Sequence, residues 1–161
     1  MKTIDEMNQH YSDFTNWVIS LEFTSEELWH HPIDHGKWSI AEIISHLISW
    51  DRCTLEQRLQ NIHMNAVLDP FPDIEAVNSR AAEYAKSGIG KKALIQEFTQ
   101  SRSAVVEGFR SFTGKEFDFK FSIGDHPFTI AGYMEEFIHH DLHHKAQIDA
   151  FLKKMEKSRT S

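Results

Sequence analysis

Apolar residues recur every three or four positions along almost the whole chain, and this spacing is typical of amphipathic helices. The expected helical segments are, in chain order, residues 4–21, 40–63, 76–84, 94–112 and 129–154. Ser39 followed by Glu42 forms a capping-box pattern, which places the start of the second helix at Ile40. Gly88 and Gly90 interrupt the pattern, so we expect a kink or break between the third and fourth segments.

The parts of the chain outside this pattern are short. Residues 69–73 form a turn-rich connection whose last residue can cap the third helix. Phe117, Phe119 and Phe121 alternate with polar residues, which predicts an extended segment or a small hairpin around residues 124–125. Together these features predict an all-α protein, a four-helix bundle with a long crossover connection and a short extended segment before the last helix.

Length and composition fit one globular domain. The chain has 161 residues, of which 40% are hydrophobic, and we assign residues 1–155 to a single domain and residues 156–161 to a polar tail. The formal net charge is −7, and Lys and Arg form no basic stripe, so nucleic acid and anionic membranes are disfavoured partners. No apolar run approaches the length needed to cross a bilayer.

The cysteine count and the first residues bear on the cellular compartment. A single cysteine, Cys53, excludes an internal disulfide framework and fits a reducing environment. Residues 1–6 lack the apolar core of a signal peptide. We therefore expect a cytoplasmic protein.

Four of the eleven histidines lie between positions 139 and 144. Residues four apart share one face of a helix, so His139 pairs with His143, and His140 pairs with His144. Two imidazoles at this spacing are a common way for a helix to bind a transition metal. At about 100° per residue, His140 and His144 lie on the apolar side of the helix and the other pair lies opposite. We favour the inner pair as metal ligands; a polyhistidine surface patch or two hydrogen-bonded core histidines are the alternatives.

A third metal ligand must come from another helix, because a catalytic metal usually has three protein ligands and one open position. His46 is the leading candidate, on the flank of the apolar stripe of the second helix beside Ile43 and Trp50. The alternative for this residue is a partly exposed helix histidine. Asp141 and Gln147 are candidates to orient the ligating imidazoles through hydrogen bonds.

Other side chains near these histidines each have two interpretations. Trp17 and Trp50 either line a substrate cleft or belong to the core. His10, on the first helix, either reaches the groove or faces solvent. Cys53 follows His46 by seven residues, about 10 Å along a helix, which is too far for the same metal.

The sequence resembles the DinB-like proteins, also described as YfiT-like metalloenzymes, along almost its whole length. Residues 38–51 carry the Trp-Ser-Ile start of that family's second helix, with His46 at the familiar spacing. Residues 140–147 are similar to the closing motif of the family. In that motif a histidine, here His140, lies four residues before a second histidine, here His144, which is followed by a basic residue, a small residue and Gln.

This resemblance implies an up-up-down-down type of four-helix bundle that is often a homodimer. It also implies a three-histidine site for nickel or zinc, with His46, His140 and His144 as ligands. Because both histidines of the closing motif are doubled, a register in which His139 and His143 replace the inner pair stays open.

The chemistry that the resemblance implies is that of a metal-dependent enzyme. Three neutral imidazoles leave a divalent ion its full charge, which lowers the pKa of a bound thiol or water. Our first hypothesis is an S-transferase that adds a low-molecular-weight thiol to small electrophiles. The alternatives are a metal-dependent hydrolase, or a stress protein that binds a small molecule or metal without turnover. The chain carries no Ser-His-Asp signature, phosphate-binding glycine loop or nucleotide fingerprint.

Overall fold

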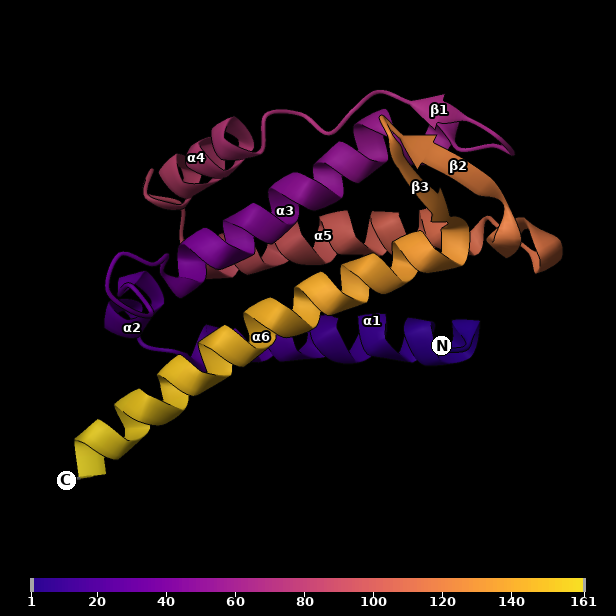
Figure 1. Cartoon of the computed structure of the whole chain (residues 1–161). Coiled ribbons are helices and arrows are strands. Elements are labelled where there is room, and N and C mark those ends of the chain that lie inside the picture. Colours follow the sequence, from indigo (N-terminus) through magenta and orange to yellow (C-terminus); the bar gives the residue numbers. More distant parts are fainter. Residues whose placement is uncertain (1, 161) are drawn as a thin grey trace.

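Four long helices form a bundle, with two shorter helices and a small sheet around it (Figure 1). The computed structural model describes residues 2–160. The helices are α1 (Ile4–Ser20), α2 (Glu26–His30), α3 (Ile40–Gln57), α4 (Ile74–Ala85), α5 (Lys91–Arg110) and α6 (Ile130–Thr160). Short 3₁₀ turns cover Leu21–Phe23, Leu59–Asn61 and Gly114–Asp118. The predicted all-α four-helix bundle is confirmed.

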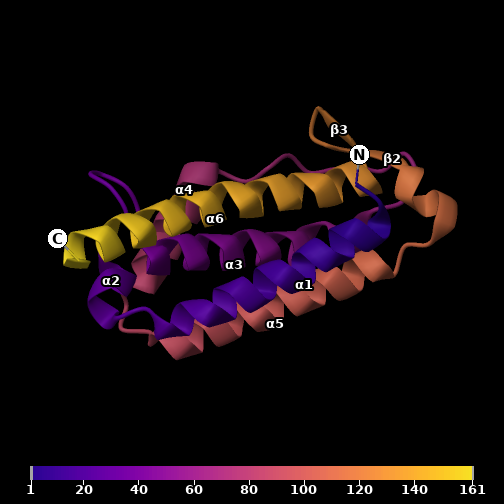
Figure 2. The ribbon, with the colours of Figure 1, turned by 90° about the horizontal axis from the view of Figure 1, so that it is seen from below.

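The direction of the four long helices differs from the up-up-down-down type. Tyr11 of α1 contacts Met134 of α6, and Trp17 contacts Asp149 further along both helices, so these two helices run parallel. Helices α3 and α5 run the opposite way (Figures 1 and 2). The order is therefore up-down-down-up. The longest connection between these helices, through α4, lies between α3 and α5 and allows them to be parallel, whereas the two shorter connections join antiparallel neighbours.

Local capping signals in the sequence set several helix starts. The Ser39 hydroxyl accepts from the Glu42 backbone N–H, and the Glu42 carboxylate accepts from the Ser39 backbone N–H, so the predicted capping box is present. The Asp73 carboxylate accepts from the Ala76 N–H at the start of α4. Thr129 accepts from a backbone N–H in the first turn of α6. The bundle therefore begins its helices where side-chain acceptors satisfy free N–H groups.

Three helix ends differ from the predicted ones. Helix α3 ends at Gln57 rather than near position 63, because Arg58 leaves the helical region and the chain turns to pack Leu59 against Gly108 of α5. Helix α5 ends at Arg110, before the predicted end at position 112. Helix α6 continues to Thr160, beyond the expected end near position 154, because Lys and Glu in that stretch are good helix formers.

A three-stranded sheet closes one end of the bundle (Figure 1). Strands β2 (Lys120–Ile123) and β3 (His126–Thr129) form the predicted hairpin around Gly124, which adopts a positive φ of 58°. Strand β1 (Val67–Leu68) pairs in parallel with β2 and was not predicted, because two residues carry no readable period. Phe117 lies in a 3₁₀ turn, not in a strand.

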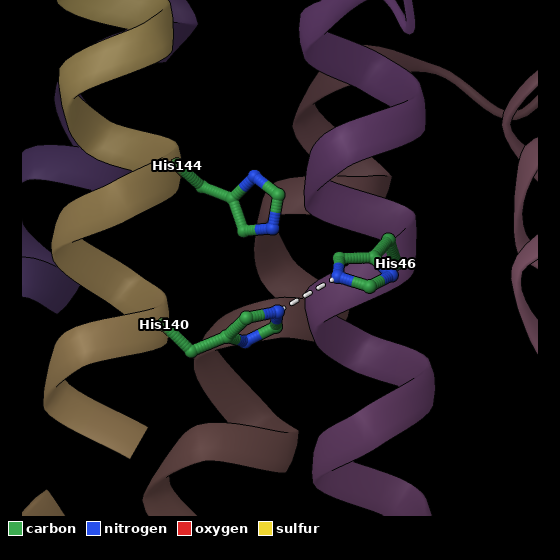
Figure 3. Close-up of side chains that lie close together, drawn as sticks. All are labelled: His46, His140 and His144. Atoms are coloured by element: carbon green, nitrogen blue, oxygen red, sulfur yellow. Dashed lines mark hydrogen bonds between the residues drawn. The ribbon is translucent and has the colours of Figure 1, made fainter. Parts of the chain in front are cut away.

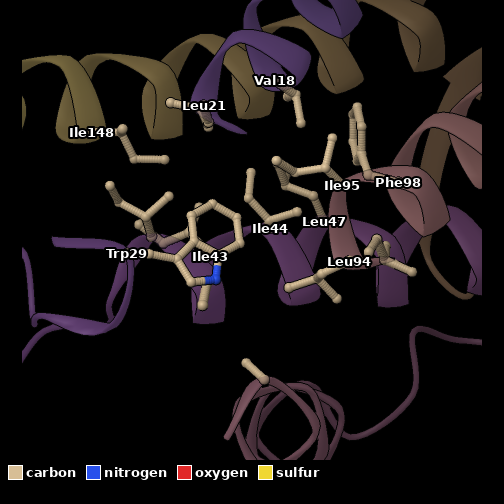
Figure 4. Close-up of a cluster of buried hydrophobic side chains, with 14 of the residues drawn as sticks. Val18, Leu21, Trp29, Ile43, Ile44, Leu47, Leu94, Ile95, Phe98 and Ile148 are labelled. Carbon is tan, nitrogen blue, oxygen red and sulfur yellow. The ribbon is translucent and has the colours of Figure 1, made fainter. Parts of the chain in front are cut away.

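The core consists of two apolar clusters along the bundle axis. The cluster nearer α2 includes ten labelled side chains in Figure 4: Val18, Leu21, Trp29, Ile43, Ile44, Leu47, Leu94, Ile95, Phe98 and Ile148. The second cluster lies toward the sheet and contains Tyr11, Phe109 and Tyr133. Each fully buried large apolar side chain contributes about 1.5–3 kcal/mol, so the two clusters hold the four helices in fixed register. Over residues 2–160, no helix combines the length and hydropathy that crossing a membrane requires.

Candidate metal centre

Three imidazoles from two helices point toward one another in the space between α3 and α6 (Figure 3). His46 projects from α3, and His140 and His144 project from successive turns of α6. The Nε2 atoms of His46 and His140 are 3.0 Å apart, and one ring nitrogen from each of the three residues lies within 4.8 Å of the others. The structure therefore brings together the three histidines that the sequence singled out.

The inner and outer histidines of α6 differ in burial, as helix phase predicts. His144 is 7% exposed and His140 is partly buried, whereas His139 and His143 are exposed. His46 is only 5% exposed, so the alternative of a partly exposed helix histidine is wrong, although its ring does line an open cavity between helices. Helix α4 packs on α3 and covers this side, an arrangement that the period of α3 alone does not reveal.

Side-chain amides fix the orientation of two of the imidazoles. His46 Nδ1 is 2.8 Å from Asn78 Oδ1, and His144 Nδ1 is 2.9 Å from Gln147 Oε1. An amide oxygen only accepts, so each Nδ1 carries the proton and each Nε2 carries a lone pair. Gln147 was predicted to orient a ligand, and this is confirmed as a hydrogen bond. Asn78 was not singled out, because it lies on α4 and its approach to α3 is a tertiary contact.

Burial keeps these imidazoles neutral. Burial, with a smaller contribution from the neighbouring His140, lowers the pKa of His46 to about 3. Burial likewise lowers the pKa of His144 to about 4, again with help from His140. The pKa of His140 is also below the ordinary value, chiefly through burial. At neutral pH all three side chains therefore retain lone pairs that can bind a cation.

The histidines line one wall of an open cavity of about 540 Å³. Six aromatic side chains line the cavity beside the histidines: Trp38, Trp50, Phe71, Phe128, Tyr133 and Phe137. Trp50 therefore belongs to the cleft, whereas Trp17 does not line this cavity and donates to Asp149. A cavity of this volume accommodates a small organic molecule beside the imidazoles.

A closed ion-pair network lies behind the histidines. The guanidinium of Arg102 donates to both carboxylate oxygens of Asp51 and of Asp141, at 2.7 to 3.2 Å. His10 Nε2 lies 3.0 Å from Asp141, so this histidine reaches the bundle interior. The expectation that Asp141 orients a ligating imidazole is wrong. Its side chain points away from the histidine group because helix α6 turns it toward α5 and α1.

The charges of this network follow from its contacts. Burial alone would raise the pKa of Asp141, but the guanidinium of Arg102 outweighs burial and holds that pKa below its usual value. Arg102 in turn has a raised pKa, because the two carboxylates outweigh its own burial. Asp141 and Arg102 therefore stay ionised inside the bundle.

Cys53 lies apart from the histidine group. The residue is 7% exposed, and its thiol contacts Gln57 one turn further along α3. Burial raises the pKa of the thiol, so the side chain stays protonated at neutral pH. The metal-capable cluster found within residues 2–160 contains His46, His140 and His144, with no cysteine or carboxylate.

The donor set suits a borderline divalent transition metal. One ring nitrogen from each of the three histidines is directed at a common point, and the Nε2 atoms of His46 and His140 are 3.0 Å apart. Three neutral nitrogen donors match nickel, zinc, copper and ferrous iron better than magnesium or calcium, which prefer oxygen. Asn78 and Gln147 supply the outer hydrogen bonds that ligating histidines usually make.

Fold and site together define a helical bundle protein with a three-histidine centre between its second and last long helices. The chain belongs to the DinB superfamily, whose sequence model matches residues 6–148. No curated protein sequence matches it.

Two solved structures share the fold. YfiT from Bacillus subtilis, described as "a probable metal-dependent hydrolase with an unusual four-helix bundle topology", is 15% identical with a TM-score of 0.75. The alignment covers 97% of this chain and 91% of YfiT. A DinB-like protein from Bacillus cereus ATCC 10987 is 16% identical with a TM-score of 0.66, and the alignment covers 96% and 93% of the two chains. The DinB and YfiT resemblance of the sequence is thereby confirmed.

Proposed function

We propose that His46, His140 and His144 hold a divalent metal and that the protein is a metal-dependent enzyme acting on a small molecule in the adjoining cavity. The observation that carries this proposal is the convergence of three buried, neutral imidazoles within 4.8 Å at the wall of a 540 Å³ cavity. Nickel and zinc are the proposed metals, because both accept three imidazoles and a fourth, exchangeable ligand.

The proposed reaction is transfer of a low-molecular-weight thiol to a small electrophile. A divalent cation on three neutral imidazoles keeps its full charge, so it lowers the pKa of a thiol or water and polarises an electrophile. The thiol sulfur bonds to the electrophilic carbon, the leaving group departs, and the thiol proton passes to solvent. Glu136 and His143 line the cavity and are exposed, so both are placed to carry that proton away.

The cavity walls support an apolar electrophile. Aromatic side chains surround the histidine group, and an apolar molecule gains free energy by leaving water for such a wall. Trp38 and Trp50 both lie close to His46, with ring centroids 4.9 and 6.4 Å from its imidazole. These rings limit the positions from which a substrate can approach.

Hydrolysis is the second candidate, favoured by the description of YfiT as a hydrolase. The same centre serves it with water in place of the thiol, and Glu136 then acts as the base that accepts the proton of water. The residues that hold the metal are the same in both candidates. The choice between them depends on the nucleophile, so it is decided by assay.

The test measures metal content first and then turnover. Protein purified without added metal is analysed for bound metal, stripped with a chelator and reloaded with nickel or zinc. We expect one metal per chain and metal-dependent consumption of a generic thiol in the presence of an alkyl halide or epoxide. Metal-dependent cleavage of esters or amides without thiol identifies the hydrolase instead. If a protein fully loaded with metal shows neither of these activities, the enzymatic proposal is overturned.

A matched pair of variants controls for the metal site. His140→Ala removes a proposed ligand, whereas His139→Ala changes the adjacent exposed histidine. We expect the first variant to lose metal and turnover together, and the second to keep both. Turnover that persists in metal-free His140→Ala would show that other residues carry the reaction.

A further inference from the structure

A second arginine of the cavity is buried without a countercharge. Arg58 follows the end of α3 and is only 5% exposed. Its Nη1 donates to the Tyr133 hydroxyl at 2.7 Å, and Phe71 covers one face of the guanidinium at 4.4 Å. Its Nη2 is shielded from water and has no hydrogen-bond partner. The side chain therefore carries a full charge and unused donors into the wall of the cavity.

Arg102 lies in the same cavity wall and, unlike Arg58, has carboxylate partners for its guanidinium. Both Asp51 and Asp141 accept hydrogen bonds from Arg102, and these ion pairs use Nε and both terminal nitrogens. Among residues 2–160, no carboxylate forms an ion pair with Arg58. Burying a guanidinium without an anion is unfavourable, so an anion that bound to Arg58 would stabilise this buried charge.

We infer that Arg58 is an anion-binding subsite that receives a carboxylate on the substrate of the metal centre. A carboxylate is planar and accepts two hydrogen bonds, which matches the unused guanidinium donors. The Tyr133 hydroxyl, itself 3.0 Å from the Thr54 hydroxyl, keeps the guanidinium in place. A rotation of Phe71, which lies in the connection between β1 and α4, opens Nη2 to the ligand.

This subsite rests on the proposed function and specifies the class of molecule involved. Arg58 contacts Tyr133, which lies seven residues before His140, about 10 Å away along the axis of α6. A molecule that contacts both ends is therefore extended, with its reacting centre at the histidines and its carboxylate at the other end. Between these ends, the aromatic side chains Phe128 and Phe137 line the cavity. The substrate class is a small amphiphile that carries a carboxylate at the end away from the reacting atom.

The test compares two probes that differ only in charge. Phenylbutyrate and phenylbutanamide share an aryl chain and differ in having a carboxylate or a neutral amide at the end. Their dissociation constants are measured by calorimetry on the metal-free full-length protein, so that no metal competes for the carboxylate. We expect the native protein to bind phenylbutyrate about tenfold more tightly than the amide, and the preference to weaken as salt rises.

Three variants separate the charge of Arg58 from its packing. Arg58→Met keeps the length of the side chain and removes the charge, and we expect the tenfold preference to vanish. Arg58→Lys keeps a charge without the planar donors, so part of the preference remains. Arg52→Met is the matched control, because Arg52 lies in α3 just before Arg58, is half exposed, and pairs with Glu97 outside the cavity. Helix content and melting temperature verify that each variant is folded.

The outcomes separate this inference from the proposed function. Equal binding of the two probes to the native protein overturns the subsite, as does a preference that persists in folded Arg58→Met. If Arg58→Met does not fold, Arg58→Lys and Tyr133→Phe provide the same comparison, and an unchanged preference in both overturns the subsite. Selective binding by a protein that takes up no metal leaves the subsite standing while the enzymatic proposal fails. Metal-dependent turnover without preference for a carboxylate gives the opposite result.

Discussion

Two buried polar clusters lie side by side in the bundle, and they are built in opposite ways. In the first, His46, His140 and His144 each direct one ring nitrogen toward a common point, with no oppositely charged group among them. In the second, Arg102 donates to both Asp51 and Asp141, so each carboxylate has a charged hydrogen-bond partner. Buried polar groups that satisfy one another stabilise a fold, whereas groups that converge without partners are suited to a ligand.

The two clusters also differ in how many helices they join. The histidine group belongs to α3 and α6 alone, with α4 supplying Asn78. The arginine network contains His10 from α1, Asp51 from α3, Arg102 from α5 and Asp141 from α6, so it reaches every long helix. Asp141 directly follows His140 in α6. The network therefore sets the depth of α6 in the bundle, and with it the position of the histidines.

Breaking the closed cluster should have the largest effect on stability. Replacing Arg102 by Met leaves two carboxylates buried without their countercharge, which typically costs about 3–5 kcal/mol of unfolding free energy. Urea unfolding followed by circular dichroism measures this loss. Arg52→Met, which removes a half-exposed ion pair with Glu97, should change stability by no more than about 1 kcal/mol. Equal losses in the two variants would contradict the central role of the network.

Removing one imidazole from the open cluster should affect metal binding far more than folding. We expect His46→Ala or His144→Ala to weaken metal affinity more than about a hundredfold. Loss of a residue that only hydrogen-bonds to a metal ligand already lowers metal affinity about ten- to a hundredfold, and loss of a ligand itself should lower it more. His143→Ala should leave the affinity unchanged. Competition with a chromogenic chelator gives these values. A comparable loss in His143→Ala would place the ligands on the other face of α6.

The amides behind the histidines should have an intermediate effect. Asn78→Ala and Gln147→Ala each leave a ligand imidazole free to rotate and to exchange tautomers, so metal affinity should fall about ten- to a hundredfold. Trp50→Phe is the control for Asn78, because it removes the indole N–H that donates to the same amide oxygen and leaves Asn78 itself in place. Unchanged affinity in Asn78→Ala would show that packing alone orients His46.

Mild acidification, from pH 7.5 to 5.5, should affect metal binding less than any of the substitutions of histidine ligands or of their amide partners. Three histidines with the ordinary pKa of 6.5 would lose about a thousandfold in apparent affinity between pH 7.5 and 5.5, because each must release a proton. Burial lowers the pKa of His46 to about 3 and of His144 to about 4, so their lone pairs persist at lower pH. We expect less than about a tenfold loss over this interval in metal titrations.

The same pKa shifts predict how the metal-free protein responds to acid. An imidazole whose pKa is lower in the folded state binds protons more readily when unfolded, so stability is greatest above about pH 6.5. Stability falls as pH decreases toward 4, because His46 and His144 bind protons in the unfolded state while they remain neutral in the folded state. Denaturant titrations at three pH values measure this slope. A stability that rises on acidification would contradict the lowered pKa values.

The amino-acid sequence determined the helices and the choice between the two histidine pairs. Both are local properties: helix phase places His140 and His144 on the apolar side, and a side-chain acceptor at Ser39 begins α3. The spacing of apolar residues therefore predicts which side of a helix enters the core. The motif around His46 added the third imidazole, although its position on α3 suggested a less buried side chain than the one observed.

Tertiary structure alone decided what surrounds those histidines. Asn78, Arg58 and Arg102 become significant only because α4, the end of α3 and α5 pack around one cavity. Their contacts join residues distant in the chain, such as Arg102 with Asp141 and Arg58 with Tyr133, and no period or motif encodes such pairs. The direction of the helices was likewise set by which connection is long. Local patterns predict faces and ends of helices, whereas burial and pairing depend on how the helices pack together.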